Sequence, residues 1–206
     1  MKKPITTIIF VLFSILSGGC SADCDHMQER PAGQSDVIAL ACDPIPVVRV
    51  GFIGLGMRGI GAVERFMYLD SVEVVALCDL EAENLARSQA VLREKTRPEA
   101  AEYMGPEDWK RLCERPDIDL VYISTDWLSH TPMAVYAMEQ GKHVAVEVPA
   151  AVTVEECWKL VDTAEKTRRH CMMLENCCYD FFELATLNMA QQGLFGEIVH
   201  AEGAYI

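Results

Sequence analysis

The fold of this chain is constrained most strongly by residues 47–59, VVRVGFIGLGMRG, where a run of apolar residues leads directly into a glycine-rich turn. Gly54, Gly56 and Gly59 have the spacing G-x-G-x-x-G, which is typical of a strand, a tight turn and a helix in succession. The first glycine permits the turn, the second lets backbone approach a pyrophosphate, and the third allows close packing of the helix on the strand. The N-terminus of that helix would offer free N–H groups and a partial positive charge to an anion. These residues therefore predict the phosphate-binding turn of a dinucleotide site.

A second apolar run, residues 72–78, ends in Asp79, about twenty residues after the last glycine of the turn. A carboxylate at this position can accept hydrogen bonds from the ribose hydroxyls of a dinucleotide, and it would repel a 2′-phosphate. The pattern therefore favours NAD over NADP as the cofactor. The alternative for Asp79 is a helix N-cap just before Glu81.

The rest of the chain alternates between predicted strands and predicted helices, an order that indicates a parallel sheet with helices packed on it. Capping signals mark three helices: Gly141 closes one, Thr153 with Glu156 forms a capping box, and Asp180 with Glu183 opens the last. Further strands are expected over 119–125, 142–148 and 171–175, with an extended segment over 197–206. Helices are expected over 81–95 and 153–168, and three more are marked at one end only: one begins at 106, one ends at 140 and one begins after 180. The predicted fold class is α/β, with a doubly wound parallel sheet.

Ligands of a doubly wound sheet bind at the carboxyl ends of the strands, so the residues that follow each strand are the candidates for chemistry. These are Asp79, the loop 126–130, Glu147-Val148 and Asn176. Trp127 could stack on a flat ring, and His130 could bind a ribose, bind a substrate hydroxyl or move a catalytic proton. The alternatives are a core-covering role for Trp127 and a place in the first turn of a helix for His130. Glu147 is expected to have a partner, because a carboxylate at the end of a buried strand is costly without one.

The N-terminal residues have the three parts of a secretory signal peptide over residues 1–20: a basic start, the apolar run 5–16 and small residues before Cys20. The apolar run is too short to span a membrane as a mature helix. The residues before Cys20 resemble a bacterial lipoprotein processing site. We therefore expect an exported protein of the periplasm or cell envelope, held to the membrane only by a lipid on Cys20. Cleavage near Ala22 is the alternative, and residues 21–46 are expected to form a linker.

The composition limits the partners and the metal chemistry of the chain. A net charge of −13 argues against nucleic acid as a partner. Nine cysteines in an exported protein invite disulfides, but Cys78, Cys157 and Cys171 lie in apolar patterns, so at most one or two bridges are expected. The metal alternative, His170 with the cysteines of residues 171–178, lacks the spacing of a zinc site. We therefore expect no metal.

Several of these motifs together resemble the glucose–fructose oxidoreductase and inositol dehydrogenase (Gfo/Idh/MocA) family, over nearly everything from residue 47 onward. They are the glycine turn, His130-Thr131-Pro132, the stretch 141–144 followed by Glu147 and Pro149, and Gly193-x-x-Gly196-Glu197-Ile198. The resemblance implies a Rossmann NAD-binding domain over residues 47–180. It also implies that residues 181–206 begin an α+β substrate domain and stop after its first strand, so we expect an incomplete chain that is inactive by itself.

Longer strings resemble one branch of that family, glycoside hydrolase family 109, typified by α-N-acetylgalactosaminidase. They are GLGMRG (54–59), VEVPAA (146–151), LENCCYDFFEL (174–184) and LNMAQQG (187–193). Together with the three glycines of the turn, the residues that the resemblance implies in NAD binding are Met57, Arg58, Asp79, Trp127, Leu128, Ser129, His130, Glu147, Val148 and Asn176.

The same resemblance bears on the substrate side of the site. It implies that Tyr205, in the last residues of the chain, reaches the substrate. His130 and Tyr179 are the candidate catalytic residues. Because the substrate domain is expected to be incomplete, we expect the catalytic base and the other sugar-binding residues to lie beyond Ile206.

One departure from the family pattern bears on the reaction. Family dehydrogenases usually have Glu-Lys-Pro where this chain has Glu147-Val148-Pro149, so the lysine that assists hydride transfer from a simple alcohol is missing. The branch implies instead that NAD oxidises the 3-hydroxyl of the sugar, after which the C2 proton leaves with the glycosidic group. Water then adds at C1 and C3 is reduced again, with retained configuration and without a metal. The substrate would be a glycan or glycoside that contains N-acetylgalactosamine.

Two other functions stay open from the sequence. The first is an NAD-dependent sugar dehydrogenase of the same family, against which the valine at position 148 argues. The second is a non-catalytic NAD-binding fragment. Whether the protein forms a homo-oligomer is open as well.

Overall fold

The computed structural model of the protein describes residue 30 and residues 33–203. The chain divides into two units, residues 1–35 and residues 36–206, and every helix and strand of the described residues belongs to the second. Six strands form one parallel sheet in the order β3-β2-β1-β4-β5-β6. They are β1 (Val48–Ile53), β2 (Val72–Cys78), β3 (Ala101–Tyr103), β4 (Leu120–Ile123), β5 (His143–Val146) and β6 (Cys171–Met173). The predicted doubly wound sheet is confirmed, since the strand order reverses between β1 and β4.

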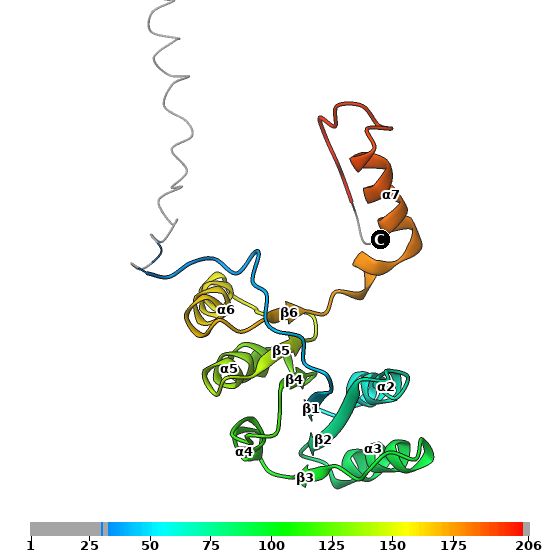
Figure 1. Cartoon of the computed structure of the whole chain (residues 1–206), viewed down its shortest axis with the longest axis vertical. Coiled ribbons are helices and arrows are strands. Elements are labelled where there is room, and N and C mark those ends of the chain that lie inside the picture. Colours follow the sequence, from blue (N-terminus) through cyan, green and yellow to red (C-terminus); the bar gives the residue numbers. More distant parts are fainter. Residues whose placement is uncertain (1–29, 31–32, 204–206) are drawn as a thin grey trace, which may run out of the picture. The chain divides into compact units, whose positions relative to one another are not determined.

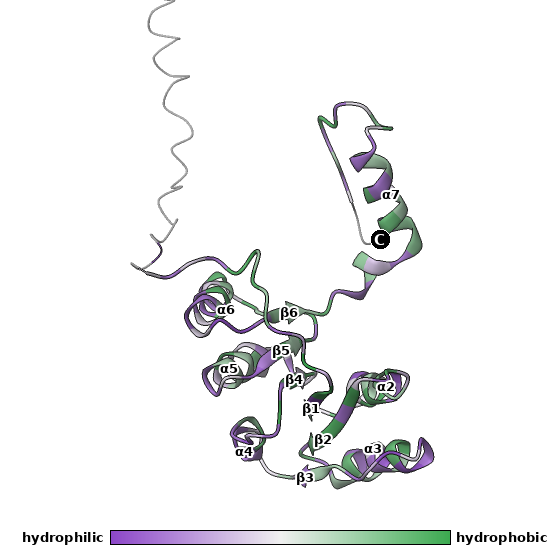
Figure 2. Cartoon of the chain, viewed as in Figure 1, coloured by the Kyte–Doolittle hydropathy of each residue, from purple (hydrophilic) through white to green (hydrophobic). Residues whose placement is uncertain are grey.

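Helices cover both faces of this sheet (Figure 1). One face carries α2 (Met57–Phe66) and α3 (Ala82–Glu94). The other carries α4 (Asp108–Cys113), α5 (Trp127–Glu139) and α6 (Val154–Thr167). The 3-10 helix η1 (Asn176–Tyr179) and α7 (Phe181–Gln191) follow β6. No residue of α7 is buried, although the helix is rich in hydrophobic side chains (Figure 2).

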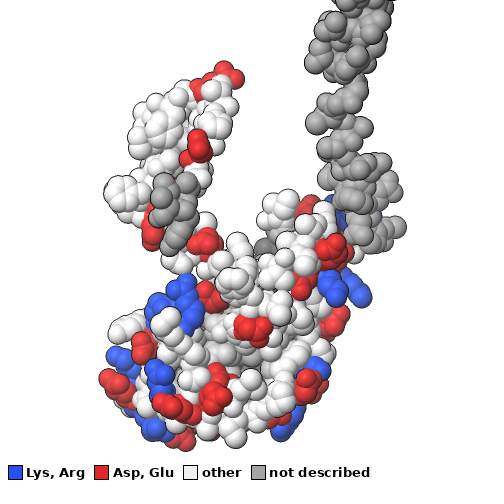
Figure 3. Space-filling view, turned by 180° about the vertical axis from the view of Figure 1, so that it is seen from behind, with Lys and Arg blue, Asp and Glu red and all other residues white. Residues whose placement is uncertain are grey.

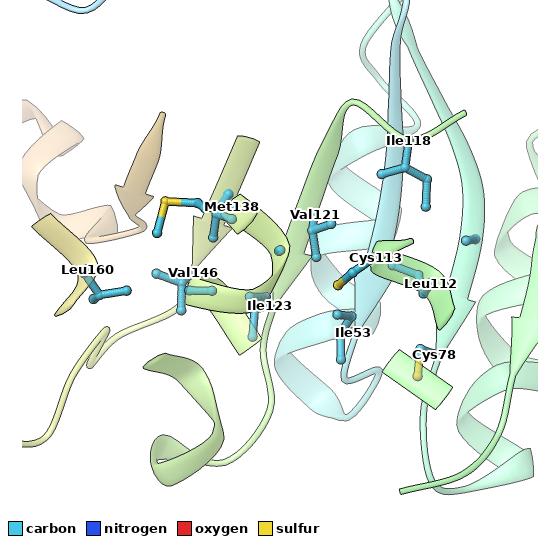
Figure 4. Packing of buried hydrophobic residues seen from close by; sticks show 14 of the residues in the cluster. Ile53, Cys78, Leu112, Cys113, Ile118, Val121, Ile123, Met138, Val146 and Leu160 are labelled. Carbon is cyan, nitrogen blue, oxygen red and sulfur yellow. The ribbon is translucent and has the colours of Figure 1, made fainter. Parts of the chain in front are cut away.

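Two apolar cores fill the spaces between the sheet and its helices, and the alternation of side chains along each strand assigns residues to one or the other. Phe52 of β1 and Tyr122 of β4 belong to the core on the side of α2 and α3. Their neighbours Ile53 and Val121 belong to the core on the side of α4, α5 and α6. Figure 4 shows that second core, with Cys78, Leu112, Cys113, Ile118, Ile123, Met138, Val146 and Leu160 labelled.

The cysteines of the described residues are all free. Cys78 is buried and Cys171 is half-buried, as predicted for cysteines in apolar patterns, and burial raises the pKa of the Cys78 thiol to about 12. The same prediction is wrong for Cys157, which is exposed. Cys157 lies in the first turn of α6, and the buried residues of that helix begin only at Leu160.

Helix α5 begins earlier than the sequence indicated, because the loop expected over 126–130 is helical from Trp127 onward. Asp126 is the N-cap residue. Its Oδ1 atom accepts hydrogen bonds from the backbone N–H groups of Leu128 at 3.0 Å and Ser129 at 3.2 Å. These bonds satisfy donors that a helix start otherwise leaves without a partner, so the helix extends back to the residue after Asp126.

The other predicted caps are present, with one difference in detail. Thr153 and Glu156 form the capping box of α6. Gly141 follows the last turn of α5 with a φ of +79°. The backbone N–H of Lys142 donates to the carbonyl of Ala137, which completes a Schellman motif. Asp180 occupies the N-cap position of α7, but its side chain makes no capping hydrogen bond.

Two segments differ from the sequence expectations. The short strand β3 was not predicted, because it lies at the edge of the sheet and none of its three side chains is fully buried, so it carries little apolar signal. Residues 197–203 were expected to begin a strand, yet they contain none, since no strand of the described residues pairs with them. Residues 33–46 also contain no helix or strand.

Several predictions concern the ends of the chain, which lie outside the described residues. At the start these are the signal peptide, Cys20 and Ala22, and at the end they are Tyr205 and Ile206. The structure therefore does not test the role given to Tyr205. The catalytic and sugar-binding residues expected beyond Ile206 stay a prediction as well.

Charge and hydropathy add two observations on the described residues. On the face shown in Figure 3, basic side chains lie among acidic ones and form no continuous basic surface. Within residues 33–203, no helix combines the length and the apolar character that crossing a membrane would take.

Candidate functional site

The glycine-rich turn joins β1 to α2 at the carboxyl edge of the sheet, and two of its glycines are required by packing. Gly54 has a φ of +85°, and a Cβ atom there would lie 2.5 Å from the carbonyl oxygen of Ser124. A Cβ atom on Gly59 would lie 2.0 Å from the carbonyl oxygen of Gly54. The turn therefore tolerates no side chain at either position, in agreement with the roles predicted for the first and third glycines.

Gly56 differs from these two glycines, because a Cβ atom there would meet no protein atom within 4 Å. Gly56 is the N-cap residue of α2, and the helix has neither a capping side chain nor an acidic residue in its first turn. The first N–H groups of α2 are thus left for a ligand, and the open space at Gly56 lets that ligand approach the backbone. Both features fit the pyrophosphate of a dinucleotide.

Asp79 follows β2, and its carboxylate accepts hydrogen bonds from the glycine turn and from the start of α3. Its Oδ2 atom accepts a hydrogen bond from the backbone N–H of Leu55 at 2.6 Å. Its Oδ1 atom accepts bonds from the backbone N–H of Glu81 at 2.8 Å and from Nδ2 of Asn84 at 3.1 Å. The N-cap residue of α3 is Glu81, so the N-cap alternative for Asp79 is wrong. A carboxylate offers about four acceptor positions, so these three bonds leave capacity for a ribose hydroxyl.

Asp79 also lines a cavity of about 450 Å³, which we call the Asp79 cavity. Its polar lining includes Gly54, Gly56, Asp79, Asn84, Ser124, Thr125, Asp126 and Ser129, and its apolar lining includes Leu80, Trp109 and Met133. Ser129 donates a hydrogen bond to Asp126 at 2.6 Å, and this bond contributes most to a lowered pKa of the Asp126 carboxyl. The cavity thus combines apolar walls with a few oriented polar groups, as ligand sites generally do.

A second cavity, of about 330 Å³, shares Ser124 and Thr125 with the first, and we call it the Trp127 cavity. Its other lining residues are Arg58, Trp127, His130, Glu147 and Val148. Trp127 is 64% exposed, so the core-covering alternative for this side chain is wrong. Val148 is 40% exposed, and no lysine of the described residues is among the lining residues.

His130 lines the Trp127 cavity, but its ring nitrogens are engaged elsewhere. The side chain is 1% exposed; Nδ1 lies 2.7 Å from the carbonyl oxygen of Pro149, and Nε2 lies 3.2 Å from that of Thr125. A neutral imidazole carries one N–H, so one of these two contacts is a hydrogen bond to a carbonyl and the other is a close approach. His130 lies in the first turn of α5 and joins this helix to the segment after β5, as its alternative expects, and its catalytic role stays a prediction.

Glu147 has the partners that its burial requires. The side chain is buried, and Tyr122 donates a hydrogen bond from its hydroxyl to Oε1 at 2.6 Å. Arg58 forms an ion pair with the other oxygen, with Nε 3.0 Å from Oε2. Arg58 also donates from Nη2 to Oδ1 of Asn176 at 2.9 Å. The hydrogen bond to Glu147 is the main cause of a raised pKa of the Arg58 guanidinium, which stays charged.

A third cavity, of about 410 Å³, shares Arg58 and Glu147 with the Trp127 cavity, and we call it the Tyr179 cavity. Its lining includes Arg58, Arg65, Tyr122, Glu147, Asn176 and Tyr179. Tyr179 and Asn176 are thereby brought near Arg58 and Glu147, whereas Met57 and Leu128 are largely exposed and line none of these three cavities.

Three residues of the site were not singled out from the sequence. Ser124 and Thr125 line both the Asp79 cavity and the Trp127 cavity, and the Ser124 hydroxyl donates to the carbonyl of Gly54 at 2.8 Å. Their signal was available, since both follow β4 directly at the carboxyl edge of the sheet. Tyr122 gave no such signal, because it lies inside a buried strand.

Among the described residues, no group of three or more histidine, cysteine, aspartate or glutamate side chains is placed to hold a metal ion.

A family model matches residues 48–175; it is described as an oxidoreductase family with an NAD-binding Rossmann fold, GFO_IDH_MocA. The α-N-acetylgalactosaminidase of Bacteroides fragilis strain NCTC 9343 is 65% identical over 177 residues, which make up 86% of this chain and 42% of that protein. Glycosyl hydrolase family 109 protein 1 of Bacteroides fragilis strain YCH46 is 65% identical over 200 residues, 95% of this chain and 43% of that protein. This chain therefore spans less than half the length of these curated relatives.

A solved structure supports the cofactor side of the comparison. The myo-inositol dehydrogenase of Lactobacillus casei, in complex with NAD(H) and myo-inositol, matches with a TM-score of 0.63 and 28% identity. The match covers 73% of this chain and 43% of that chain.

Proposed function

Because this chain belongs to the Gfo/Idh/MocA oxidoreductase family, with an NAD-binding Rossmann domain over residues 48–175, we propose that it is the cofactor-binding part of a glycosidase. The substrate class would be α-linked N-acetylgalactosaminides. The observation that carries this proposal is 65% identity, over 86% of the chain, to a protein named α-N-acetylgalactosaminidase. The matched stretch of 177 residues is longer than the 128 residues that the family model covers.

Different residues of the site would bind different parts of NAD. The N–H groups at the start of α2 would bind the pyrophosphate, and Asp79 would accept a hydrogen bond from a ribose hydroxyl. Trp127 and Val148 would form the apolar wall next to the reacting ring, since both are partly exposed and line the Trp127 cavity. When bound, NAD would supply reversible oxidation at C3 of the sugar, which makes the neighbouring C2 proton acidic.

A sugar dehydrogenase of the same family is the second candidate, and Val148 is the observation that argues against it. Family dehydrogenases usually have a lysine at this position, and this chain departs from that pattern. No lysine is among the described residues that line the Trp127 cavity, and because both reactions oxidise a hydroxyl, both would need a base from elsewhere.

The proposal can be tested in a chimera that has the full length of one of the relatives. Residues 47–180 of this chain would replace the corresponding residues of the Bacteroides fragilis α-N-acetylgalactosaminidase, and the unaltered Bacteroides enzyme would be the control. We expect the chimera to hydrolyse a chromogenic α-N-acetylgalactosaminide with no net formation of NADH. In deuterated water the released sugar should carry deuterium at C2, because elimination requires that proton to leave and a solvent proton to return.

Three results would contradict parts of this proposal in different ways. No hydrolysis by a folded chimera, while the control is active, would overturn the glycosidase assignment. Hydrolysis without deuterium at C2 would exclude elimination but leave the substrate class standing. Accumulation of NADH and a keto sugar, with the glycosidic bond intact, would establish the dehydrogenase instead.

A further inference from the structure

A chain of polar contacts links four elements at the carboxyl edge of the sheet, and it begins at Tyr122 in β4. The Tyr122 hydroxyl donates to Glu147, which follows β5; Glu147 pairs with Arg58 of α2; and Arg58 donates to Asn176 of η1. Three of these residues were candidates for NAD binding from the sequence. Tyr122 was not, and it lines the Tyr179 cavity but not the Trp127 cavity.

The ring of Tyr122 is held in place by aromatic packing. It stacks on Phe52 with ring centroids 5.0 Å apart, and Phe66 of α2 meets it edge to face at 5.7 Å. Because strand alternation directs Tyr122 to the same face of the sheet as α2, its hydroxyl can reach past the ring packing to Glu147. The hydroxyl is therefore a fixed donor whose position does not depend on a flexible side chain.

Glu147 has one donor on each carboxylate oxygen, Tyr122 on Oε1 and Arg58 on Oε2. A buried carboxylate that lost the Tyr122 hydroxyl would have one oxygen without a donor, which is costly. The carboxylate would then rotate to share both oxygens with Arg58, or it would draw in water. Either change moves the guanidinium group that Glu147 holds.

Arg58 has five N–H donors, and among the described residues Glu147 and Asn176 take two of them. It is the second residue of α2, close to Gly56, and it lines the Trp127 cavity. A cation at this point adds its charge to the positive end of the helix, where the dinucleotide is expected.

We infer that Tyr122 is a positioning residue for the cofactor: by holding Glu147, it fixes the Arg58 guanidinium at the start of α2 for contact with NAD. The inference rests on the NAD-binding assignment and is independent of the reaction on the sugar. It predicts that the tyrosine hydroxyl, which touches neither the glycine turn nor the Trp127 cavity, sets the affinity for NAD through two intervening side chains.

The test compares two tyrosine hydroxyls in the full chain by calorimetric titration with NAD. Tyr122→Phe keeps the packed ring and removes the hydroxyl, and we expect the NAD affinity to fall about fivefold to tenfold. Tyr136→Phe is the matched control. The Tyr136 hydroxyl donates to Glu114 at the same distance of 2.6 Å, but Tyr136 lines none of the three cavities and is not part of the glycine turn. The control should bind NAD as the unmutated chain does. Thermal unfolding without NAD shows whether each variant is folded.

A double-mutant cycle separates positioning from a general structural effect. In an Arg58→Ala background, Tyr122→Phe should cause no further loss of NAD affinity, since its action passes through Arg58. If Tyr122→Phe does not fold, Glu147→Gln is measured with and without Arg58→Ala, and it should weaken NAD binding only where Arg58 is present.

Unchanged NAD affinity of folded Tyr122→Phe would overturn the inference, as would an equal loss with and without Arg58. No binding of NAD by the unmutated chain would overturn the cofactor assignment itself. Failure of the chimera to hydrolyse the glycoside would contradict only the proposed reaction and would leave this inference standing.

Discussion

At the scale of single residues, the same carboxylates that would serve a ligand also hold the protein together. Asp79 bonds the N–H of Leu55 inside the glycine turn and two groups at the start of α3. Asp126 caps α5 and lines the Asp79 cavity. A substitution at either residue therefore changes structure and ligand binding together, and variants must be chosen to separate the two effects.

The charge of Asp79 should decide between NAD and NADP. Asp79→Asn keeps an oxygen that can accept from Leu55 but removes the negative charge that repels a 2′-phosphate. Two charges about 4 Å apart in water interact by about 1 kcal/mol, so we expect the NAD preference to narrow about fivefold. Calorimetric titration with both cofactors measures this ratio. Asp70→Asn, at an exposed acid before β2, is the control and should leave the ratio unchanged. Equal binding of both cofactors by the unmutated chain would contradict the role given to Asp79.

His143 should make the stability of the chain depend on pH. Its Nδ1 atom accepts a hydrogen bond from the backbone N–H of His170 at 3.1 Å, and the two rings lie 5.0 Å apart. Burial, followed by the nearby His170 and Arg169, lowers the pKa of His143 below its ordinary value. A depressed histidine pKa means that the unfolded chain binds the proton more tightly, so stability falls as the pH drops below about 6.5.

Replacing His143 by glutamine removes that titrating group. Chemical unfolding at about pH 7.5 and about pH 5 should then show a smaller loss of free energy on acidification than the unmutated chain shows. His200→Gln, at an exposed histidine, should leave the loss unchanged. The same pH dependence in His143→Gln and the unmutated chain would show that another group is responsible.

At the scale of elements, the contact of β1, the turn and α2 is the most demanding packing in the site. Two glycines of α2, Gly59 and Gly61, illustrate this because they differ only in what surrounds them. A Cβ atom on Gly59 would lie 2.0 Å from backbone, whereas one on Gly61 would lie 3.4 Å from the end of the flexible Arg65 side chain.

Alanine at these two positions should therefore have opposite effects. Gly59→Ala forces the helix away from the turn, and we expect it to lower the free energy of unfolding by about 1–3 kcal/mol and to weaken NAD binding. Gly61→Ala should be neutral or stabilising by up to about 1 kcal/mol, because alanine favours a helix and the site has room. Chemical unfolding and calorimetry measure both quantities. A Gly59→Ala variant as stable as Gly61→Ala would show that α2 does not pack closely on the turn.

At the scale of the whole molecule, the chain matches less than half the length of its relatives, and no residue of α7 is buried. Its N-terminal residues carry the pattern of an exported lipoprotein, which lies outside the described residues. We propose on this pattern alone that the protein is exported and held at the cell envelope by a lipid on Cys20.

That proposal has a simple biochemical test in a bacterial host that processes lipoproteins. The protein should separate into the detergent phase of a detergent–water extraction, and Cys20→Ser should move it to the aqueous phase. Cys42→Ser, which changes an exposed cysteine of the described residues, is the control and should stay in the detergent phase. A mature N-terminus at a residue other than Cys20, found by mass spectrometry, would contradict lipidation.

Local patterns in the sequence were enough to specify the fold class, the order of the elements other than β3, and most of the caps. These features depend on interactions over a few residues: the φ of Gly54 and Gly141, the capping box at Thr153, and the apolar runs that become β1 and β2. The same patterns also predicted which loops lie at the carboxyl edge of the sheet, because parallel strands present their carboxyl ends at one edge.

What each side chain of the site bonds to became clear only from the packed chain. The contact of Tyr122 with Glu147 joins residues 25 positions apart, and that of Arg58 with Asn176 joins residues 118 apart. Both contacts depend on how the strands are aligned and on the face of the sheet on which each side chain lies. His130 shows the same limit, since the two backbone carbonyls that its ring nitrogens approach follow β4 and β5. Local patterns cannot specify such contacts, because they exist only once separate segments have packed against one another.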